Sequence, residues 1–436
     1  MSEHTSAGTT ATAEDPSPET IAPRSPKGYV PTAALAGFGL YTALLTPIFG
    51  GLSVKIQDMV GLADAPALLG IVTGAGAVVS SVVQPIAGRL SDRSTSRFGM
   101  RRPFILFGAI GVFFALIGVA LASNFVTLLL AWCLTQAAAN FALAANHTTL
   151  ADQVPEARRG GVSGIIGATT PAAILGGALV LAVAPNDFLR FVLPAAFGLL
   201  TSIIFVIVLK DRVRTEPPTT PLGIKQIFGS FLFDPRKAPD FGWAWLSKAL
   251  ILLGYGGVST YLTLFLGSSF GMDTDEQLQF NAIAQVVGIA TLVVFSVVGG
   301  YLSDKLGRRK PFVLASGLVI AAGVLLSAAS PSFGGGGLAV LLVAQAVIGA
   351  GAGTFFAVDQ ALCISLLPNP EEMGKDLGIL NLAGTIPGSI APLLAGVLFI
   401  PLGNALFGGG YTLWFSIAAA IAVIGSLLVL KIKAGR

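Results

Sequence analysis

Charged residues are scarce in this chain of 436 residues. Asp, Glu, Lys and Arg together make up 11% of it, against about 25% in an average soluble domain. Apolar residues make up 54%, and the mean hydropathy is +0.81. A water-soluble enzyme of this length needs a charged surface that this sequence does not supply. The composition therefore excludes the soluble, disordered, collagenous and disulfide-scaffold classes and leaves the membrane class.

Cysteine and histidine are also rare, which limits the chemistry available to the chain. The two cysteines, Cys133 and Cys363, lie in apolar stretches and imply no disulfide framework. The two histidines, His4 and His147, are far apart in sequence, and no metal-ligand cluster, nucleophile elbow or phosphate-binding loop occurs. We therefore expect no enzyme activity, no metal, no cofactor and no nucleotide-driven pump.

Long apolar runs, in contrast, are abundant. A bilayer-spanning helix needs about 20 residues, and twelve stretches of about that length follow one another. They cover residues 30–53, 67–87, 103–122, 125–150, 162–184, 188–209, 242–266, 278–300, 311–329, 338–364, 378–400 and 409–430. The sequence therefore predicts an all-α polytopic membrane protein with twelve transmembrane helices.

The longest interruption divides these stretches into two groups of six. We expect an N-terminal six-helix bundle at 29–210, a cytoplasmic linker at 211–240 and a C-terminal six-helix bundle at 241–436. Residues 1–28 hold almost no large apolar side chains, so we expect a disordered cytoplasmic tail there.

The basic residues indicate how the chain is oriented. With the N-terminus in the cytoplasm, every Lys and Arg except Lys55, Arg190 and Lys248 falls in a cytoplasmic segment. Because cytoplasmic loops carry the excess of Lys and Arg, both termini are predicted to be cytoplasmic, in a plasma membrane protein. The same distribution explains the net charge of +4 without nucleic acid as a partner.

The loop after the second span of each half carries a repeated motif. GRLSDRSTSRFGMRRPF begins at Gly88 and GYLSDKLGRRKPF begins at Gly300, 212 residues later. The chain therefore contains two homologous halves of six helices. Repeats of this kind are typical of secondary transporters, whose substrate site lies near the midplane between the halves.

These paired loops resemble the loop signature of the major facilitator superfamily. That resemblance implies two six-helix bundles around a central cavity, lined by the first, fourth, seventh and tenth helices. The longer first loop and the stretch Asn146–Asp152 are also similar to the glycoside-pentoside-hexuronide cation symporters and the sucrose–proton symporters. In this chain His147 stands where that branch has Arg.

The motif residues predict a gating loop at the cytoplasmic edge. Its members are Gly88, Asp92, Arg93, Arg101 and Arg102 in the first copy, and Gly300, Asp304, Lys305, Arg308 and Arg309 in the second. We expect the two glycines to end their helices and each Asp to pair with a neighbouring guanidinium or cap a helix. Such contacts form a latch that makes and breaks during transport; the alternative is a plain cluster of positive charge.

Three ionisable residues lie inside predicted spans, where they are costly and usually functional. At about 1.5 Å per residue, His147, Lys248 and Asp359 all lie roughly 12–13 Å from the cytoplasmic edge. We interpret them as proton-coupling or substrate-binding residues, with Lys248 as the partner of Asp359. The alternatives are a hydrogen-bonded core histidine, a lysine that reaches inward to water, and a static ion pair.

Neutral polar residues recur at helical spacing in the spans that the resemblance places around the cavity. The candidates are Gln136, Asn140, Tyr255, Ser259, Gln345, Thr42, Thr46, Asn381 and Thr385. Hydroxyl and amide groups suit a neutral polyhydroxylated substrate, although such residues also hold helices together. Gly and Pro residues predict broken helices near 46–51, 254–257 and 386–388.

These features favour a proton-coupled symporter of a small polar solute, such as a sugar or glycoside, that works by alternating access. The expected partners are that solute, protons and the lipid bilayer, and the expected functional unit is a monomer. The alternative is a proton-coupled exporter of drugs or metabolites, suggested by the 28 phenylalanines and a faint Gly/Pro pattern in the fifth span.

Overall fold

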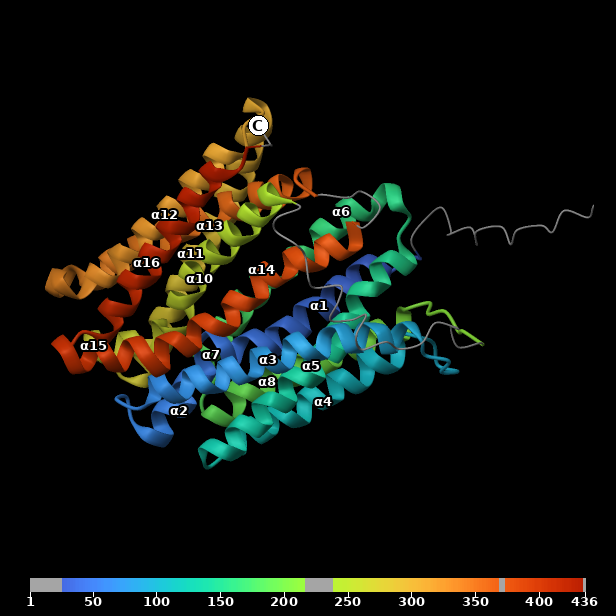
Figure 1. Cartoon of the computed structure of the whole chain (residues 1–436). Helices are drawn as coiled ribbons and strands as arrows, with labels where there is room; N and C mark the ends of the chain where they lie inside the picture. Colours follow the sequence, from blue (N-terminus) through green and yellow to red (C-terminus); the bar gives the residue numbers. More distant parts are fainter. Residues whose placement is uncertain (1–25, 216–237, 368–372, 434–436) are drawn as a thin grey trace, which may run out of the picture.

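The computed structural model describes residues 26–215, 238–367 and 373–433, and every regular element in these ranges is a helix (Figure 1). The first half contains α1 (Tyr29–Thr46), η1 (Pro47–Gly51), α2 (Leu52–Val60), α3 (Ala65–Asp92), α4 (Arg102–Leu121), α5 (Phe125–Gln153), α6 (Glu156–Gly167), α7 (Thr169–Val183) and α8 (Asp187–Val208). The second half contains α10 (Pro239–Phe270), α11 (Thr274–Leu306), α12 (Lys310–Ala329), η2 (Ser330–Gly336), α13 (Gly337–Ser365), α14 (Met373–Leu394), η4 (Ala395–Phe399), α15 (Ile400–Phe407), α16 (Gly410–Leu428) and η5 (Val429–Lys431).

The described residues contain 11 helical segments long and apolar enough to cross a membrane. One of them, of 56 residues, runs from Lys310 to Ser365 and is too long for one pass. It consists of α12 and α13, which pack against each other and are joined by η2, where Gly334 has a φ of 55°. The described chain therefore makes twelve passes, and the all-helical polytopic membrane fold is confirmed.

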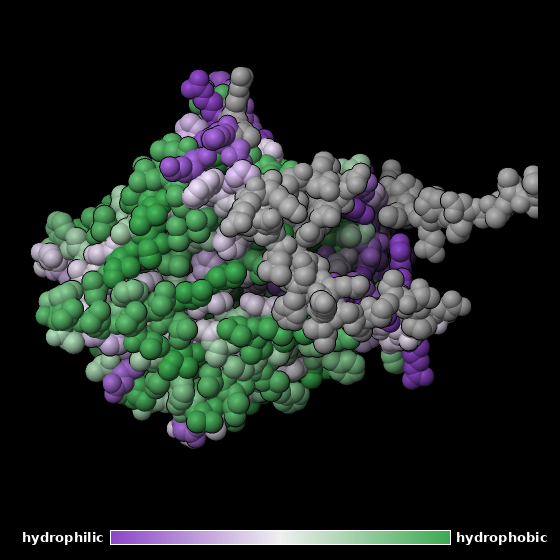
Figure 2. Space-filling view, in the orientation of Figure 1, coloured by the Kyte–Doolittle hydropathy of each residue, from purple (hydrophilic) through white to green (hydrophobic). Residues whose placement is uncertain are grey.

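The helices pack as two groups. α1, α3, α4, α5, α7 and α8 pack among themselves, and so do α10, α11, α12, α13, α14 and α16 (Figure 1). Apolar side chains form a broad band over the visible surface of both groups, and hydrophilic side chains gather at the ends (Figure 2). The expected tail (1–28) and linker (211–240) lie largely outside the described residues, at 1–25 and 216–237.

The two ends of the helices differ in charge. We call the end with loops 93–101, 154–155 and 307–309 the basic end, and the end with loops 61–64, 184–186 and 271–273 the far end. The two groups meet near α2 and α15 and spread apart toward α6 and the C-terminus (Figure 1).

Side-chain contacts between the groups lie toward the far end. Tyr261 of α10 places its hydroxyl 3.2 Å from the carbonyl oxygen of Pro66 in α3 and 2.6 Å from that of Pro392 in α14. A Cβ on Gly70 would lie 2.7 Å from the Pro392 oxygen, and one on Gly396 would collide with the Pro66 oxygen. The two glycines therefore let α3 and the α14–η4 segment approach backbone to backbone.

The motif glycines do not end their helices, so that expectation was wrong. α3 continues past Gly88 to Asp92, and α11 continues past Gly300 to Leu306. The turns fall instead on Gly99, with a φ of 108°, and Gly307, with a φ of 62°. Glycine is favoured there because other residues rarely adopt positive φ.

Of the three predicted helix breaks, only the first is correct. At η1 the backbone leaves helical geometry at Phe49 and Gly50. α10 runs unbroken through Gly254 and Gly257, which instead permit close packing against Ala418 and Trp414 of α16. α14 is continuous through 386–388, and the π-helical segment η4 follows it at Ala395.

Candidate functional site

A largely buried ion pair joins α10 and α13 of the second group. Lys248 Nζ on α10 is 2.8 Å from Asp359 Oδ2 on α13, and the two side chains are 13% and 5% exposed. Both residues come from helices packed in the same group, and Lys248 contacts Asp359 directly, as expected of its partner. Each charge offsets the cost of burying the other.

Two further side chains complete the surroundings of this pair. Gln360 Oε1 lies 3.4 Å from Lys248 Nζ, and the buried Cys363 thiol donates to Asp359 Oδ1 over 3.7 Å. Tyr255, two turns along α10, meets the exposed Phe356 edge to face. The carboxylate thus has a cation on one oxygen and a weak donor on the other.

The histidine of the fourth span lies in the first group and faces open space. His147 is exposed although it lies within α5, and its Nε2 is 3.1 Å from the Tyr41 hydroxyl of α1. Both residues line a cavity of about 350 Å³ between α1, α5, α6 and α7. His147 belongs to the first group and the ion pair to the second, and no contact between the two is found among the described residues.

The other predicted cavity residues have mixed surroundings. Thr42 and Thr46 are buried, and each donates to a carbonyl of its own helix. Gln136 and Asn140 are buried in α5, where the Asn140 amide donates to the Gln136 carbonyl. In this conformation these four residues occupy packing positions.

The remaining candidates are less buried or outside the described side chains. Tyr255, Ser259, Gln345 and Thr385 are half-buried, and the side chain of Asn381 lies outside the described part of the structure. The half-buried candidates remain available to a cavity, whereas the role of Asn381 stays a prediction.

The first copy of the loop motif forms an ionic network at the basic end. Arg101 places Nη1 2.6 Å from Asp92 and Nε 3.0 Å from Asp152, and its Nη1 also donates to Ser91. Burial lowers the pKa of the Arg101 guanidinium, but hydrogen bonds to Asp152 and Asp92 more than compensate, so its pKa is raised. All these partners belong to the first group, and the network links α3, α4 and α5.

A residue of the linker completes this network. Asp211 accepts hydrogen bonds from the backbone N–H groups of Arg101 and Arg102 at 2.6 and 2.8 Å. A carboxylate is stabilised at this position because it faces the N-terminus of α4. Gly99 is required beside it, since a Cβ there would collide with the Asp211 side chain.

The second copy is arranged differently. Arg309 donates to the Ala361 carbonyl over 2.9 Å, and Ser365 occupies the place that Asp152 has in the first half. Asp304, Lys305 and Arg308 are exposed, and within the described ranges Asp304 makes no ion pair. Among the described residues, the network is therefore assembled in the first half only.

Sequence reasoning missed several members of both sites. Tyr41 and Asn146 lie beside His147, and Asp211 caps α4. Tyr41 lies one residue before Thr42, so the helical stripe chosen on the first span was rotated by one position. Asp211 carried a signal, because it is an acidic residue within a basic run directly after the sixth span.

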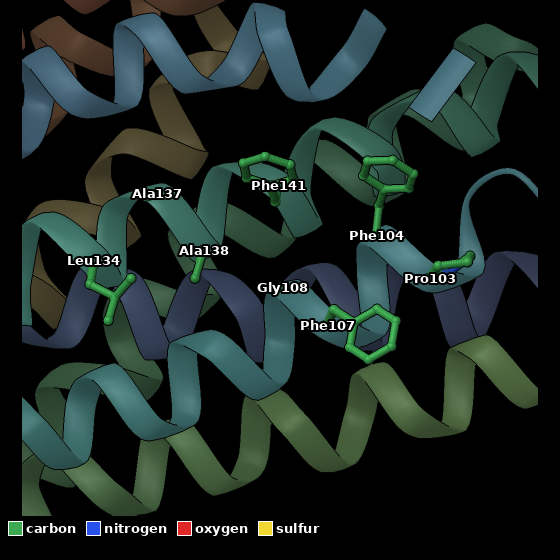
Figure 3. A pocket seen from close by; sticks show the side chains of 8 residues that line it. All are labelled: Pro103, Phe104, Phe107, Gly108, Leu134, Ala137, Ala138 and Phe141. Carbon is green, nitrogen blue, oxygen red and sulfur yellow. The ribbon is translucent and has the colours of Figure 1, made fainter. Parts of the chain in front are cut away.

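The surface groove shown in Figure 3 has a different character. It measures about 380 Å³ and lies between α4 and α5, where Phe104 and Phe141 stack and Phe107 and Leu134 are exposed. All eight lining residues are apolar, which suits contact with lipid rather than a polar solute. Within the described ranges, no cluster of three or more His, Cys, Asp or Glu side chains is placed to hold a metal ion.

Solved structures share this fold. The chain matches the nucleoside transporter NupG with a TM-score of 0.73 and 12% identity, covering 93% of this chain and 100% of that one. It matches a D-xylose–proton symporter with a TM-score of 0.69 and 18% identity, covering 93% and 98%. A bacterial homolog of the human lysosomal transporter Spinster, inward-facing and unoccupied, gives a TM-score of 0.69 and 18% identity, covering 94% and 99%.

Sequence comparison matches a short part of the chain to curated relatives and most of the chain to a family model. Proton-associated sugar transporter A of Homo sapiens is 40% identical over 87 residues, and the mouse and rat proteins match equally. This alignment covers 20% of the chain and only 10% of the relatives' length. The family model of the Major Facilitator Superfamily matches residues 32–392 and 277–434. With its twelve passes and two six-helix groups, the chain belongs to the major facilitator superfamily of membrane transporters.

Proposed function

We propose that this transporter is a proton-coupled symporter of a small, neutral, polar solute such as a sugar or glycoside. The observation that carries the proposal is the buried Lys248–Asp359 pair at 2.8 Å. An ionisable pair inside a membrane protein is costly and usually marks an ion or proton pathway. Relatives described as proton-linked sugar transporters, and the resemblance to the glycoside-pentoside-hexuronide and sucrose–proton symporters, support the same class.

The proposed coupling step is a proton exchange on Asp359. While Lys248 is in contact, the carboxylate stays ionised because the ammonium stabilises its charge. When the helices move and separate the pair, burial disfavours the charged carboxylate, and Asp359 takes up a proton. Return of Lys248 expels the proton, so the two residues convert a change in helix packing into proton transfer.

We propose that the basic end lies in the cytoplasm of a plasma membrane protein, as expected from the distribution of Lys and Arg. The structure then represents a state closed toward the outside, because the side-chain contacts between the groups gather at the far end. Transport proceeds by movement of one group against the other.

The substitution Asp359→Asn tests the coupling role. In proteoliposomes, it should abolish solute accumulation driven by a proton gradient, while exchange of solute across the membrane survives. The control is Cys133→Ala, a substitution in a transmembrane helix of the other group. This variant should accumulate solute normally. Retained, pH-dependent accumulation in Asp359→Asn would place the coupling site elsewhere.

The same vesicles distinguish import from export. A symporter accumulates solute when the outside is acidic, whereas a proton-coupled exporter of drugs or metabolites moves solute against the proton flow. Uptake driven by an outside-acidic gradient therefore identifies symport, whereas uptake driven by an inside-acidic gradient identifies antiport.

A further inference from the structure

Two apolar grooves adjoin each other on the surface of the first group. The first, between α4 and α5, measures about 380 Å³ and is shown in Figure 3. The second, between α4 and α8, measures about 400 Å³ and includes Val206 and Ile207. Pro103 and Phe107 line both grooves, and the Phe107 side chain is 70% exposed. A phospholipid can therefore place one acyl chain on each side of the Phe107 ring.

The second groove also reaches aromatic and charged side chains at the basic end. Phe98, in the loop between α3 and α4, and Arg102, in the first turn of α4, belong to its lining. Phe98 is 63% exposed, and the guanidinium of Arg97 lies over its ring, 5.0 Å from the centroid. Exposed aromatic rings beside basic residues suit the membrane interface, where an apolar ring meets the headgroups. The loop thus places the charge of Arg97 beside the groove.

Among the described residues, three cations at this place lack a carboxylate partner. The Arg102 side chain donates to the carbonyl oxygen of Leu209, and neither Arg97 nor the exposed Lys210, the next residue, forms an ion pair with a described residue. Asp211 accepts its hydrogen bonds from backbone N–H groups at the start of α4. We call Arg97, Arg102 and Lys210 the basic rim. Its charge attracts an anionic headgroup.

We propose that the two grooves and the basic rim bind one anionic phospholipid, with its acyl chains along α4 and its phosphate beside Arg97 and Lys210. A zwitterionic lipid offers the same chains, but its headgroup brings a cation that the rim repels. A soluble phosphate ester offers the charge, but nothing that covers the apolar grooves. The site goes beyond the proposed function, since it involves neither the solute nor the proton.

Native mass spectrometry of the full-length transporter in detergent tests this proposal. The probes are phosphatidylglycerol, phosphatidylcholine with the same acyl chains, and glycerophosphoglycerol, which is the first lipid without its chains. We expect the protein to retain one phosphatidylglycerol at concentrations where the other two probes leave it unoccupied. Equal retention of the two lipids would show unselective contact with lipid. Equal binding of glycerophosphoglycerol would show a phosphate site without lipid, and either result would overturn the proposal.

Two double variants with the same loss of charge test the basic rim. Arg97→Gln with Lys210→Gln removes two exposed cations beside the groove, whereas Lys305→Gln with Arg308→Gln removes two exposed cations of the second group. We expect the Kd for phosphatidylglycerol to rise about thirtyfold in the first variant, since each cation contributes about a factor of five. The second variant should bind like the parent. Equal Kd values in the two variants would refute a role for the rim.

Two phenylalanines of α4 test the grooves in the same measurement. Phe107→Ala removes the ring that both grooves share, whereas Phe114→Ala removes a ring that is 64% exposed and lines neither groove. We expect Phe107→Ala to bind both lipids several-fold more weakly and Phe114→Ala to bind them like the parent. Because both rings are largely exposed, neither substitution leaves a cavity in the core. Unchanged binding of phosphatidylglycerol by Phe107→Ala would show that the acyl chains lie elsewhere.

Discussion

The Lys248–Asp359 pair is the least exposed ion pair among the described residues. Asp359 is buried, only 13% of the Lys248 side chain is exposed, and the two charged groups are 2.8 Å apart. Removing one partner of such a pair leaves an uncompensated charge, which costs far more than the pair itself contributes. The stability of the protein should therefore respond differently to single and double neutralisation.

We expect Lys248→Met to lower the free energy of unfolding by about 3 kcal/mol, because Asp359 is left buried without its cation. The double variant Lys248→Met with Asp359→Asn should recover most of that loss, since no charge remains to be compensated. Thermal unfolding in detergent measures both. Equal losses in the single and the double variant would show that the pair is not energetically coupled in the folded state.

Sequence reasoning identified this pair because depth in a helix follows from counting residues. His147 was identified in the same way, but Tyr41 and Asn146 were not. Which face of a helix lines a cavity depends on the rotation of that helix against its neighbours. The rotation of a helix is set by its packing, for example by the contact of Gly177 with Thr46. It cannot be derived from one amino-acid sequence alone.

Among the elements, the α3–α4 connection is held by ion pairs and hydrogen bonds from several helices. Arg101 joins Asp92 to Asp152, and the linker residue Asp211 fixes the start of α4. Two spans of the sequence prediction stopped at the motif glycines because hydropathy falls there. The helices continue because backbone hydrogen bonding persists beyond the apolar segment.

Substitution of the motif aspartates should have unequal effects. Asp92→Asn removes one of the two carboxylates on Arg101, so we expect slower transport with little change in solute affinity. Asp304→Asn should have a smaller effect, because Asp304 is exposed and makes no ion pair within the described ranges. Initial rates and half-saturation concentrations in proteoliposomes separate the two quantities. A large loss of affinity at unaltered turnover in Asp92→Asn would contradict a gating role.

The contact between α3 and α14 provides a second prediction for the elements. Gly396→Ala places a methyl group against the Pro66 carbonyl, so it should push the two helices apart and weaken closure of the far end. In a background without Cys133 and Cys363, a cysteine at the buried position Ser53 should then react faster with a membrane-impermeant maleimide.

The control for this variant lies at the other end of the molecule. Gly300→Ala adds a methyl group at ordinary contact distance, 3.6 Å from Ala357, and should leave labelling at position 53 unchanged. Labelling that is equally slow in Gly396→Ala and the parent would mean that this contact does not hold the far end closed.

For the molecule as a whole, the fold was predictable and the conformation was not. The bilayer forces apolar helices of fixed length, so twelve passes follow from composition and spacing. The choice between a state closed at the far end and one closed at the basic end depends on a few contacts between the groups. Two such states generally differ in free energy by only a few kcal/mol. The hydrophobic periodicity and the charge distribution of the sequence do not reveal so small a difference.

A cross-link at the far end tests whether the two groups must move apart there. Arg190 of the first group lies 2.7 Å from Asp275 of the second, and a further contact joins the Asn281 amide to the Phe49 carbonyl. With cysteines at 190 and 275 joined by a short bismaleimide, the far end cannot open, so turnover should cease while binding from the basic end persists. Cysteines at 190 and 187, a pair within the first group, carry the same reagent without bridging the groups and should allow transport. Full transport by protein whose 190–275 cross-link has been verified by mass spectrometry would rule out alternating access by separation of the two groups at this end.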